Sequence, residues 1–174
     1  MTVPGYTGSG PGHWQSIWER DDRSMQRVEQ RDWNRPDVVE WPASIERAVQ
    51  SAEQPVVLLA HSCGVTAVAL WAREYRTPIA GAFLVAPADP ASAAADERVQ
   101  SFGPVPLVPL PFRALVIASD DDPYCSITRA GEYAAAWGAA LVTVEGAGHI
   151  NTASGHGPWP EGKALLDAFC ATLR

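Results

Sequence analysis

Three short apolar runs restrict the fold of this chain more than any other feature. They span residues 56–60, 81–86 and 114–118, and they are almost continuously apolar instead of alternating with polar residues. Strands of this composition are buried on both faces, as in a parallel sheet that helices cover on either side. Segments with helical spacing separate the runs. The sequence therefore predicts an α/β fold with a mostly parallel sheet and helices on both faces.

The other segments continue this alternation along the whole chain. Further strands are expected at 2–4, 27–33 and 140–146, which gives a sheet of about six strands. Helices are expected at 13–25, from 42 onward, and at 63–75, 126–137 and 162–173. We find no internal repeat and no linker, so the 174 residues are predicted to form one domain, 1–174.

Composition limits the kind of partner. The net charge of −7 and the isoelectric point near 5.0, without clustered Lys or Arg, argue against nucleic acid and anionic membranes. No apolar run approaches the roughly 20 residues of a membrane span, and no secretory leader is visible. Cys63, Cys125 and Cys170 lack CxxC spacing, so neither a disulfide framework nor a zinc site is indicated. We expect a cytoplasmic protein.

Ligands of open α/β sheets bind beyond the carboxyl ends of the strands, so the loops there are where chemistry is expected. A-H-S-C-G, at 60–64, follows a strand and opens a helix. It matches the nucleophile-elbow pattern G-x-S-x-G except that Ala60 replaces the first glycine. Small residues are needed there because the strand and the helix approach closely. A helix N-cap is the structural alternative, but Gly64 and the strand–turn–helix context favour Ser62 as a nucleophile.

The loop S-D-D-D-P-Y-C-S, at 119–126, offers a carboxylate downstream of the serine, as the chain order Ser…Asp…His requires. Asp122 precedes Pro123, and proline restricts the residue before it to extended conformations that can direct a side chain across the strand ends. Asp120 or Asp121 could supply the carboxylate instead. A solvated acidic turn is the alternative, and a magnesium site lacks a second acidic cluster.

The loop E-G-A-G-H-I-N, after the last expected strand, places His149 in the third position of that order. His149 would take the proton of Ser62 and return it to the leaving group. Asp122 would fix the imidazole tautomer and stabilise the imidazolium.

The glycine-rich loop GYTGSGPG, at 5–12, can contribute to an oxyanion hole. Its donor would be the backbone N–H of Tyr6, together with that of Cys63. A dinucleotide-binding turn, with Asp32 on the ribose, is the rival interpretation. The glycine spacing differs from that motif, however, and Pro11 removes a backbone donor.

Several other residues are expected near the mouth of the site. Trp14 and Trp159 could line an acyl or aromatic pocket, although packing explains them equally well. His13 and His156 could contact a polar end of the substrate, although hydrogen bonding within their loops is the simpler interpretation. The proline-rich segment 88–112 is either a rigid connection or a small cap beside the pocket.

Six segments spread over nearly the whole chain resemble the compact serine hydrolases related to retinoblastoma-binding protein 9 and bacterial YdeN. The segments are VPGYTGSGPGHWQSIWE, AHSCG, FGPVPLVPLPF, ASDDDPYCS, AWGA and GHINTASGHGPWPEG. The resemblance implies an α/β-hydrolase fold without a large lid and a triad at Ser62, Asp122 and His149. The chain departs from the family in Ala60 and in a first strand of only a few residues.

The sequence thus predicts a minimal α/β-hydrolase that cleaves a small carboxylic ester, thioester or amide through an acyl-enzyme. This chemistry requires neither a metal nor an organic cofactor. The alternative is a non-catalytic protein-interaction module on a hydrolase scaffold, since fold alone does not determine activity. A complete set of serine, acid, base and glycine-bearing loops argues against that alternative.

Overall fold

A computed structural model describes residues 1–173 and contains a five-stranded sheet with the order β1-β2-β3-β4-β5. The strands are β1 (Thr2–Val3), β2 (Val57–Ser62), β3 (Gly81–Pro87), β4 (Ala114–Ser119) and β5 (Ala140–Val144). All neighbouring strands pair in parallel, so their carboxyl ends lie along one edge of the sheet. The predicted α/β class and parallel sheet are confirmed.

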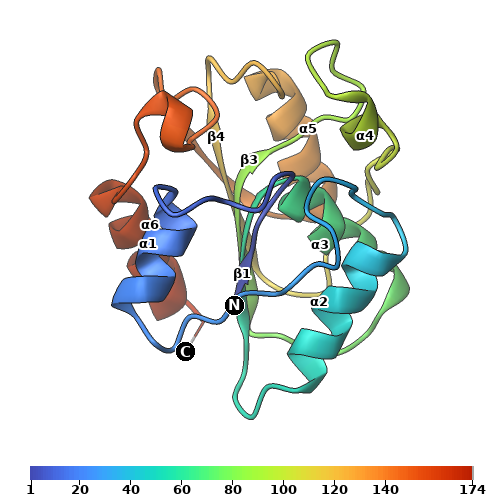
Figure 1. Ribbon diagram of the computed structural model, residues 1–174, viewed down its shortest axis with the longest axis vertical. Helices are drawn as coiled ribbons and strands as arrows, with labels where there is room; N and C mark the ends of the chain where they lie inside the picture. Colours follow the sequence, from blue (N-terminus) through green and yellow to red (C-terminus); the bar gives the residue numbers. More distant parts are fainter. Residues whose placement is uncertain (174) are drawn as a thin grey trace.

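Helices cover both faces of this sheet (Figure 1). One face carries α2 (Glu40–Gln50), α3 (Cys63–Glu74) and α5 (Ile127–Trp137), and the other carries α1 (Trp14–Asp21) and α6 (Pro160–Ala171). The short α4 (Glu97–Gln100) and a 3-10 turn, η1 (Thr152–Ser154), lie in connections at the carboxyl edge of the sheet.

The core consists of two apolar layers, one on each side of the sheet. All seven residues of the central strand β3 are buried, which explains its continuous apolar composition. The layer under α2, α3 and α5 contains Trp41, Trp71 and Trp137, and the opposite layer contains Trp14 and Trp159. Each large aromatic side chain contributes roughly 2–3 kcal/mol by its removal from water.

The sheet has five strands instead of about six because the expected strand 27–33 does not form. The segment makes only an isolated bridge between Arg27 and Thr2. The two-residue β1 offers a neighbour little backbone with which to pair. Beyond it, the Asp32 carboxylate accepts a hydrogen bond from the Asn34 backbone N–H (2.8 Å), which turns the chain instead of extending it.

Candidate active site

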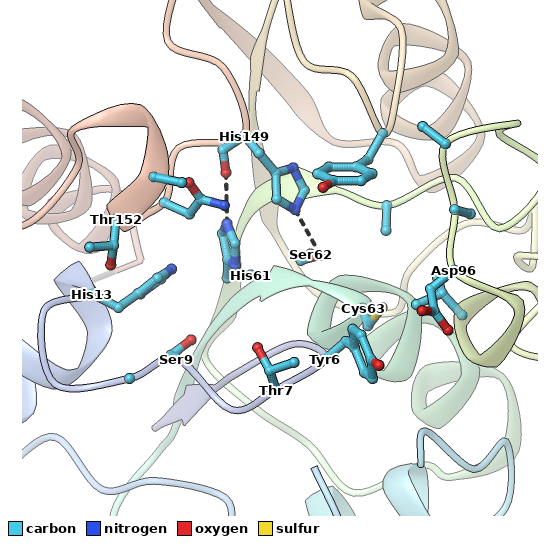
Figure 2. A pocket seen from close by; sticks show the side chains of 18 of the residues that line it. Tyr6, Thr7, Ser9, His13, His61, Ser62, Cys63, Asp96, His149 and Thr152 are labelled. Atoms are coloured by element: carbon cyan, nitrogen blue, oxygen red, sulfur yellow. Dashed lines mark hydrogen bonds between the residues drawn. The ribbon is translucent and has the colours of Figure 1, made fainter. Parts of the chain in front are cut away.

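A pocket of about 630 Å³ opens at the carboxyl edge of the sheet (Figure 2). It is lined by parts of the loop 6–13, the elbow 61–63, the segment 88–99, Tyr124 and the loop 149–153. These are the connections in which ligands of open α/β sheets bind. The segment 88–99 therefore borders the pocket, as the cap interpretation predicted.

Ser62 lies at the sharp junction between β2 and α3. Its backbone has φ 55° and ψ −124°, a strained conformation for a residue other than glycine. A Cβ at Gly64 would lie 2.1 Å from the Val3 carbonyl oxygen, so α3 begins in direct contact with β1. The surroundings therefore hold the serine in the strained turn that characterises a nucleophile elbow.

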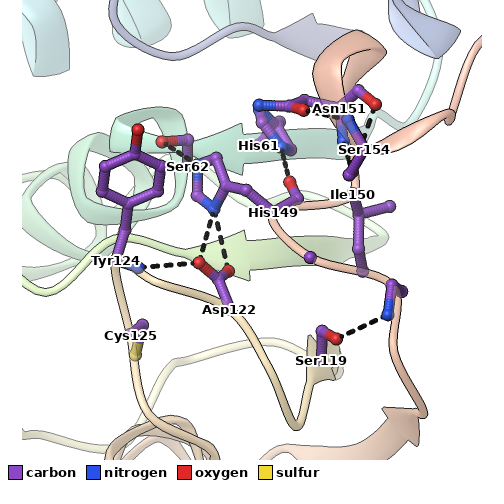
Figure 3. Close-up of polar contacts among 12 residues, drawn as sticks. His61, Ser62, Ser119, Asp122, Tyr124, Cys125, His149, Ile150, Asn151 and Ser154 are labelled. Atoms are coloured by element: carbon purple, nitrogen blue, oxygen red, sulfur yellow. Dashed lines mark hydrogen bonds and ion pairs between the residues drawn. The ribbon is translucent and has the colours of Figure 1, made fainter.

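The Ser62 side chain is hydrogen-bonded to a buried imidazole, and that imidazole is hydrogen-bonded in turn to a buried carboxylate (Figure 3). His149 Nε2 lies 2.8 Å from Ser62 Oγ, and His149 Nδ1 lies 2.8 Å and 3.0 Å from the two oxygens of Asp122. Because an ionised carboxylate can only accept a hydrogen bond, the imidazole proton lies on Nδ1, and the Nδ1–H group donates a hydrogen bond to Asp122. Nε2 is then free to accept the hydrogen bond that the Ser62 hydroxyl donates.

The three consecutive aspartates make different contacts. These contacts distinguish Asp122 from Asp120 and Asp121, the alternatives that the sequence offered for the carboxylate beside His149. Asp120 accepts a hydrogen bond from the backbone N–H of Gly146 (2.8 Å), and Asp121 accepts one from Gly148 (2.7 Å). Asp122 is the one that contacts the imidazole ring, and it also accepts the backbone N–H of Tyr124. The first two carboxylates therefore hold the loop, and the third holds the ring.

Ser119 supports this arrangement and was not singled out from the sequence. Its hydroxyl donates to Asp121 (2.6 Å) and accepts the backbone N–H of Ala147 (2.9 Å). The Ser119 hydroxyl and the Gly148 N–H together lower the pKa of Asp121 below its usual value. A polar residue that ends an apolar strand is the signal that could have identified Ser119.

Two further histidines lie next to His149. His61 is buried, and its Nε2 is 2.9 Å from the His149 carbonyl oxygen, to which it donates. The ring of His13 lies 4.7 Å from that of His61 in an edge-to-face arrangement. Burial lowers the pKa of His61 well below its usual value and that of His13 to about 4. Both rings are therefore neutral near pH 7.

Trp14 and Trp159 do not line the pocket, so the expectation that they form an acyl or aromatic pocket is wrong. They are 0% and 5% exposed, and their rings contact each other and Trp18 in the layer between α1 and α6. The indole N–H of Trp14 donates to the Ile150 carbonyl (3.0 Å), next to His149. The tryptophans therefore pack behind the histidine loop.

The glycine-rich loop runs against the elbow. A Cβ at Gly5 would lie 2.9 Å from the Ser62 Cβ and 3.1 Å from the Cys63 nitrogen. The N–H of Cys63 is the first of α3 and has no acceptor within that helix. The adjoining Tyr6 lines the pocket. Burial raises the pKa of the Cys63 thiol to about 11, which keeps it protonated, unlike an activated cysteine.

The same loop does not match a dinucleotide site. Asp32, the candidate ribose ligand, does not line the pocket. The loop closes onto Trp33 instead: the Thr7 N–H donates to the Trp33 carbonyl (3.0 Å), and a Cβ at Gly8 would lie 2.8 Å from the Trp33 ring. Pyrophosphate would require an open turn at this position.

Within residues 1–173, no three His, Cys, Asp or Glu side chains are grouped so that they could hold a metal ion. In the same part of the chain, no helix has the length and apolar character that a membrane crossing requires.

The chain was compared with known families and structures. The family model described as serine hydrolase matches residues 1–168. A protein assigned as a YdeN-like hydrolase from Pectobacterium atrosepticum is 40% identical, with a TM-score of 0.88 over 99% of this chain and 90% of that chain. The comparison confirms the resemblance to YdeN-like hydrolases.

Two more distant structures share the fold. The ydeN gene product of B. subtilis is 21% identical, with a TM-score of 0.75 over 98% of this chain and 97% of that chain. Thermogutta terrifontis esterase 2 is 17% identical, with a TM-score of 0.68 over 99% of this chain and 83% of that chain. A search of curated protein sequences finds no match.

Proposed function

The chain belongs to the serine hydrolase family, and we propose that it hydrolyses a small carboxylic ester, thioester or amide through an acyl-enzyme formed on Ser62. The observation that supports the proposal most directly is the continuous hydrogen-bonded set of Ser62, His149 and Asp122 at the mouth of the pocket. A serine hydroxyl is a weak nucleophile at neutral pH, and an adjacent base is what activates it.

The first half-reaction forms the acyl-enzyme. As Ser62 Oγ attacks the carbonyl carbon, its proton moves to His149 Nε2, which lies 2.8 Å away. The carbonyl oxygen becomes an oxyanion, which the backbone N–H groups of Cys63 and Tyr6 would stabilise. The intermediate then collapses, and the imidazolium of His149 gives its proton to the departing alcohol, thiol or amine.

The second half-reaction repeats these steps with water. His149 removes a proton from the water that attacks the acyl carbon, and it returns the proton to Ser62 Oγ as the carboxylic acid leaves. Asp122 accepts from Nδ1 throughout, which keeps Nε2 available and stabilises the imidazolium.

The size of the pocket favours small substrates. Its volume is about 630 Å³, and the segment 88–99 that borders it contains only the four-residue helix α4. A long acyl chain would extend beyond this border into solvent. Thermogutta terrifontis esterase 2 shares the fold and is by its name an esterase, so a carboxylic ester is the first bond to test.

Labelling with a fluorophosphonate tests this proposal. We expect the intact mass of the wild-type protein to increase by a single adduct, and the Ser62→Ala variant to remain unlabelled. Turnover of a short-chain ester should fall on the order of 10⁶-fold in that variant. Ser24→Ala, an exposed serine, is the matched control and should label like the wild type. An unlabelled but folded wild-type protein would instead favour the interaction-module alternative.

A further inference from the structure

The pocket has two unlike sides around Ser62 (Figure 2). One side is formed by the segment 88–99, where the small apolar side chains of Ala88, Ala94, Ala95 and Val99 line the pocket together with Asp89 and Asp96. The other side is polar and is formed by Ser9, His13, His61, Asn151 and Thr152. A pocket with such different sides can distinguish between the two ends of a substrate.

His13 carries a hydrogen-bond donor on the polar side. It is the N-cap of α1, and its Nδ1 accepts the backbone N–H of Gln15 (3.2 Å). A neutral imidazole carries a proton on only one of its two nitrogens. Because Nδ1 of His13 accepts a hydrogen bond, the proton lies on Nε2. Burial keeps the ring neutral by lowering its pKa to about 4. Near pH 7, His13 therefore presents an N–H at Nε2.

This donor has no partner within the protein. His13 is only 5% exposed, and its Nε2 is buried without an acceptor among residues 1–173. A buried donor without a partner is unfavourable, because it has lost its hydrogen bond to water. The ring extends toward His61, the neighbour of Ser62, and lines the pocket (Figure 2). Because the atom has almost no exposed surface, an acceptor on a bound molecule would satisfy the N–H after a neighbouring side chain moves aside.

The nearby polar groups do not duplicate this donor. The hydroxyl of Ser9 already donates to the side chain of Gln15 (2.6 Å). The side-chain oxygen of Asn151 accepts the backbone N–H of Ser154 (3.0 Å). The amide N–H groups of Asn151 and the hydroxyl of Thr152 are also donors on this side, but Asn151 is only half-buried and Thr152 is exposed, so water can reach them. His13 differs from them because its donor is buried.

The charges around the pocket indicate that the acceptor is uncharged. No lysine or arginine side chain lines it, whereas Asp89 and Asp96 do. These two aspartates already pair with Arg129 (3.5 Å) and Arg98 (3.7 Å), respectively. A carboxylate placed here would therefore be desolvated without a lining cation to pair with. An ether, carbonyl or hydroxyl oxygen avoids this cost.

We propose that His13 Nε2–H binds an uncharged oxygen of the substrate close to the bond that Ser62 attacks. The enzyme then selects substrates with an ether, carbonyl or hydroxyl oxygen over alkyl substrates of equal size. This inference rests on the proposed function, because it takes Ser62 as the nucleophile. One neutral hydrogen bond in a buried site corresponds to about a tenfold preference.

Isosteric fluorophosphonates test the inference without knowledge of the natural substrate. One pair carries a butyl or a 2-methoxyethyl group on phosphorus, and a second pair carries a butoxy or a 2-methoxyethoxy group. The rate of adduct formation is followed by intact mass, and each rate is divided by the rate at which hydroxide hydrolyses the same reagent. In at least one pair, the wild type should react about tenfold faster with the oxygen-bearing member.

The His13→Ser variant should lose this preference, with a ratio near one. Serine is a good N-cap, so the start of α1 is retained while the donor is removed. His156→Ser is the matched control, because His156 contacts Ser154 (3.2 Å) and does not line the pocket. Its ratio should equal that of the wild type. His13→Thr, which also caps and carries no side-chain N–H, replaces His13→Ser if that variant does not fold.

Each outcome separates the inference from the proposed function. Equal rates for both members of both pairs in the labelled wild type would overturn the role of His13 and leave Ser62 as the nucleophile. A preference that persists in His13→Ser would also overturn it. If none of the four reagents forms an adduct, the result would instead contradict the proposed function itself, in which Ser62 is the nucleophile.

Discussion

The elbow and the loop that carries His149 are held in place by different physical means. The elbow depends on contact between backbones, since a Cβ at Gly64 would lie 2.1 Å from the Val3 carbonyl oxygen. The loop at residues 145–150 depends on hydrogen bonds to Asp120 and Asp121 and on the bond from His61. The elbow should therefore be sensitive to added atoms, and the histidine loop to lost charges and lost hydrogen bonds.

The largest effect is expected on the hydrogen-bonded side, at Asp122. Asp122→Asn preserves shape but allows the amide to donate to His149 Nδ1, which then favours the wrong tautomer. We expect kcat for a short-chain ester to fall on the order of 10⁴-fold with little change in thermal stability. Asp120→Asn is the control, because the Asp120 carboxylate accepts from the Gly146 backbone and not from His149, and the fall in kcat should be far smaller. Equal losses in the two variants would contradict the comparison.

On the sterically held side, Gly64→Ala should reduce stability strongly. The added Cβ overlaps the Val3 carbonyl oxygen, so α3 must move away from β1. We expect the free energy of unfolding to fall by about 4 kcal/mol in urea titrations. Gly131→Ala, in α5, is the matched control, because no atom lies within 4 Å of its Cβ. That variant should be more stable by about 0.5–1 kcal/mol, and a similar loss in both would show that contact is not the cause.

Acid should destabilise the protein through its buried histidines. His13 has a pKa of about 4 in the folded protein, against about 6.5 in an unfolded chain. Between these values the unfolded chain binds more protons, so the free energy of unfolding falls as the pH falls from 6.5 toward 4. His13 contributes up to ~3 kcal/mol to this fall. Urea unfolding at several pH values measures this fall. In the His13→Ser variant, the free energy of unfolding should depend less steeply on pH. An unchanged slope would exclude His13 as its source.

The smallest effect is expected for Ser119→Ala. The change removes the acceptor for the buried N–H of Ala147 and one donor to Asp121. We expect a loss of about 2 kcal/mol in the free energy of unfolding, because a buried N–H is left unpaired. Ser51→Ala, whose hydroxyl donates to the Ala48 carbonyl on an exposed helix end, should cost less than half as much. Equal costs would mean that water replaces the Ser119 hydroxyl.

Much of the fold and part of the candidate site could be predicted from local sequence patterns. The apolar runs predicted β2, β3 and β4, because strands buried on both faces exclude polar residues. The small residues Ala60 and Gly64 beside Ser62 predicted a tight strand-to-helix junction, because only small side chains fit there. Burial and steric fit of this kind are properties that neighbouring residues determine together.

Tertiary structure alone decided which side chains meet. In the sequence, the proline that follows Asp122 is the one feature that favours it over Asp120 and Asp121, and the path of the loop after β5 brings the imidazole to Asp122. The sequence explains Trp14 equally well as a pocket residue or as a packing residue. The packing of α1 on the sheet places its side chain in the core. The unpaired Nε2 of His13 likewise exists only because α1 uses Nδ1 as its cap. Long-range geometry sets these contacts, since each depends on where separate loops end in space.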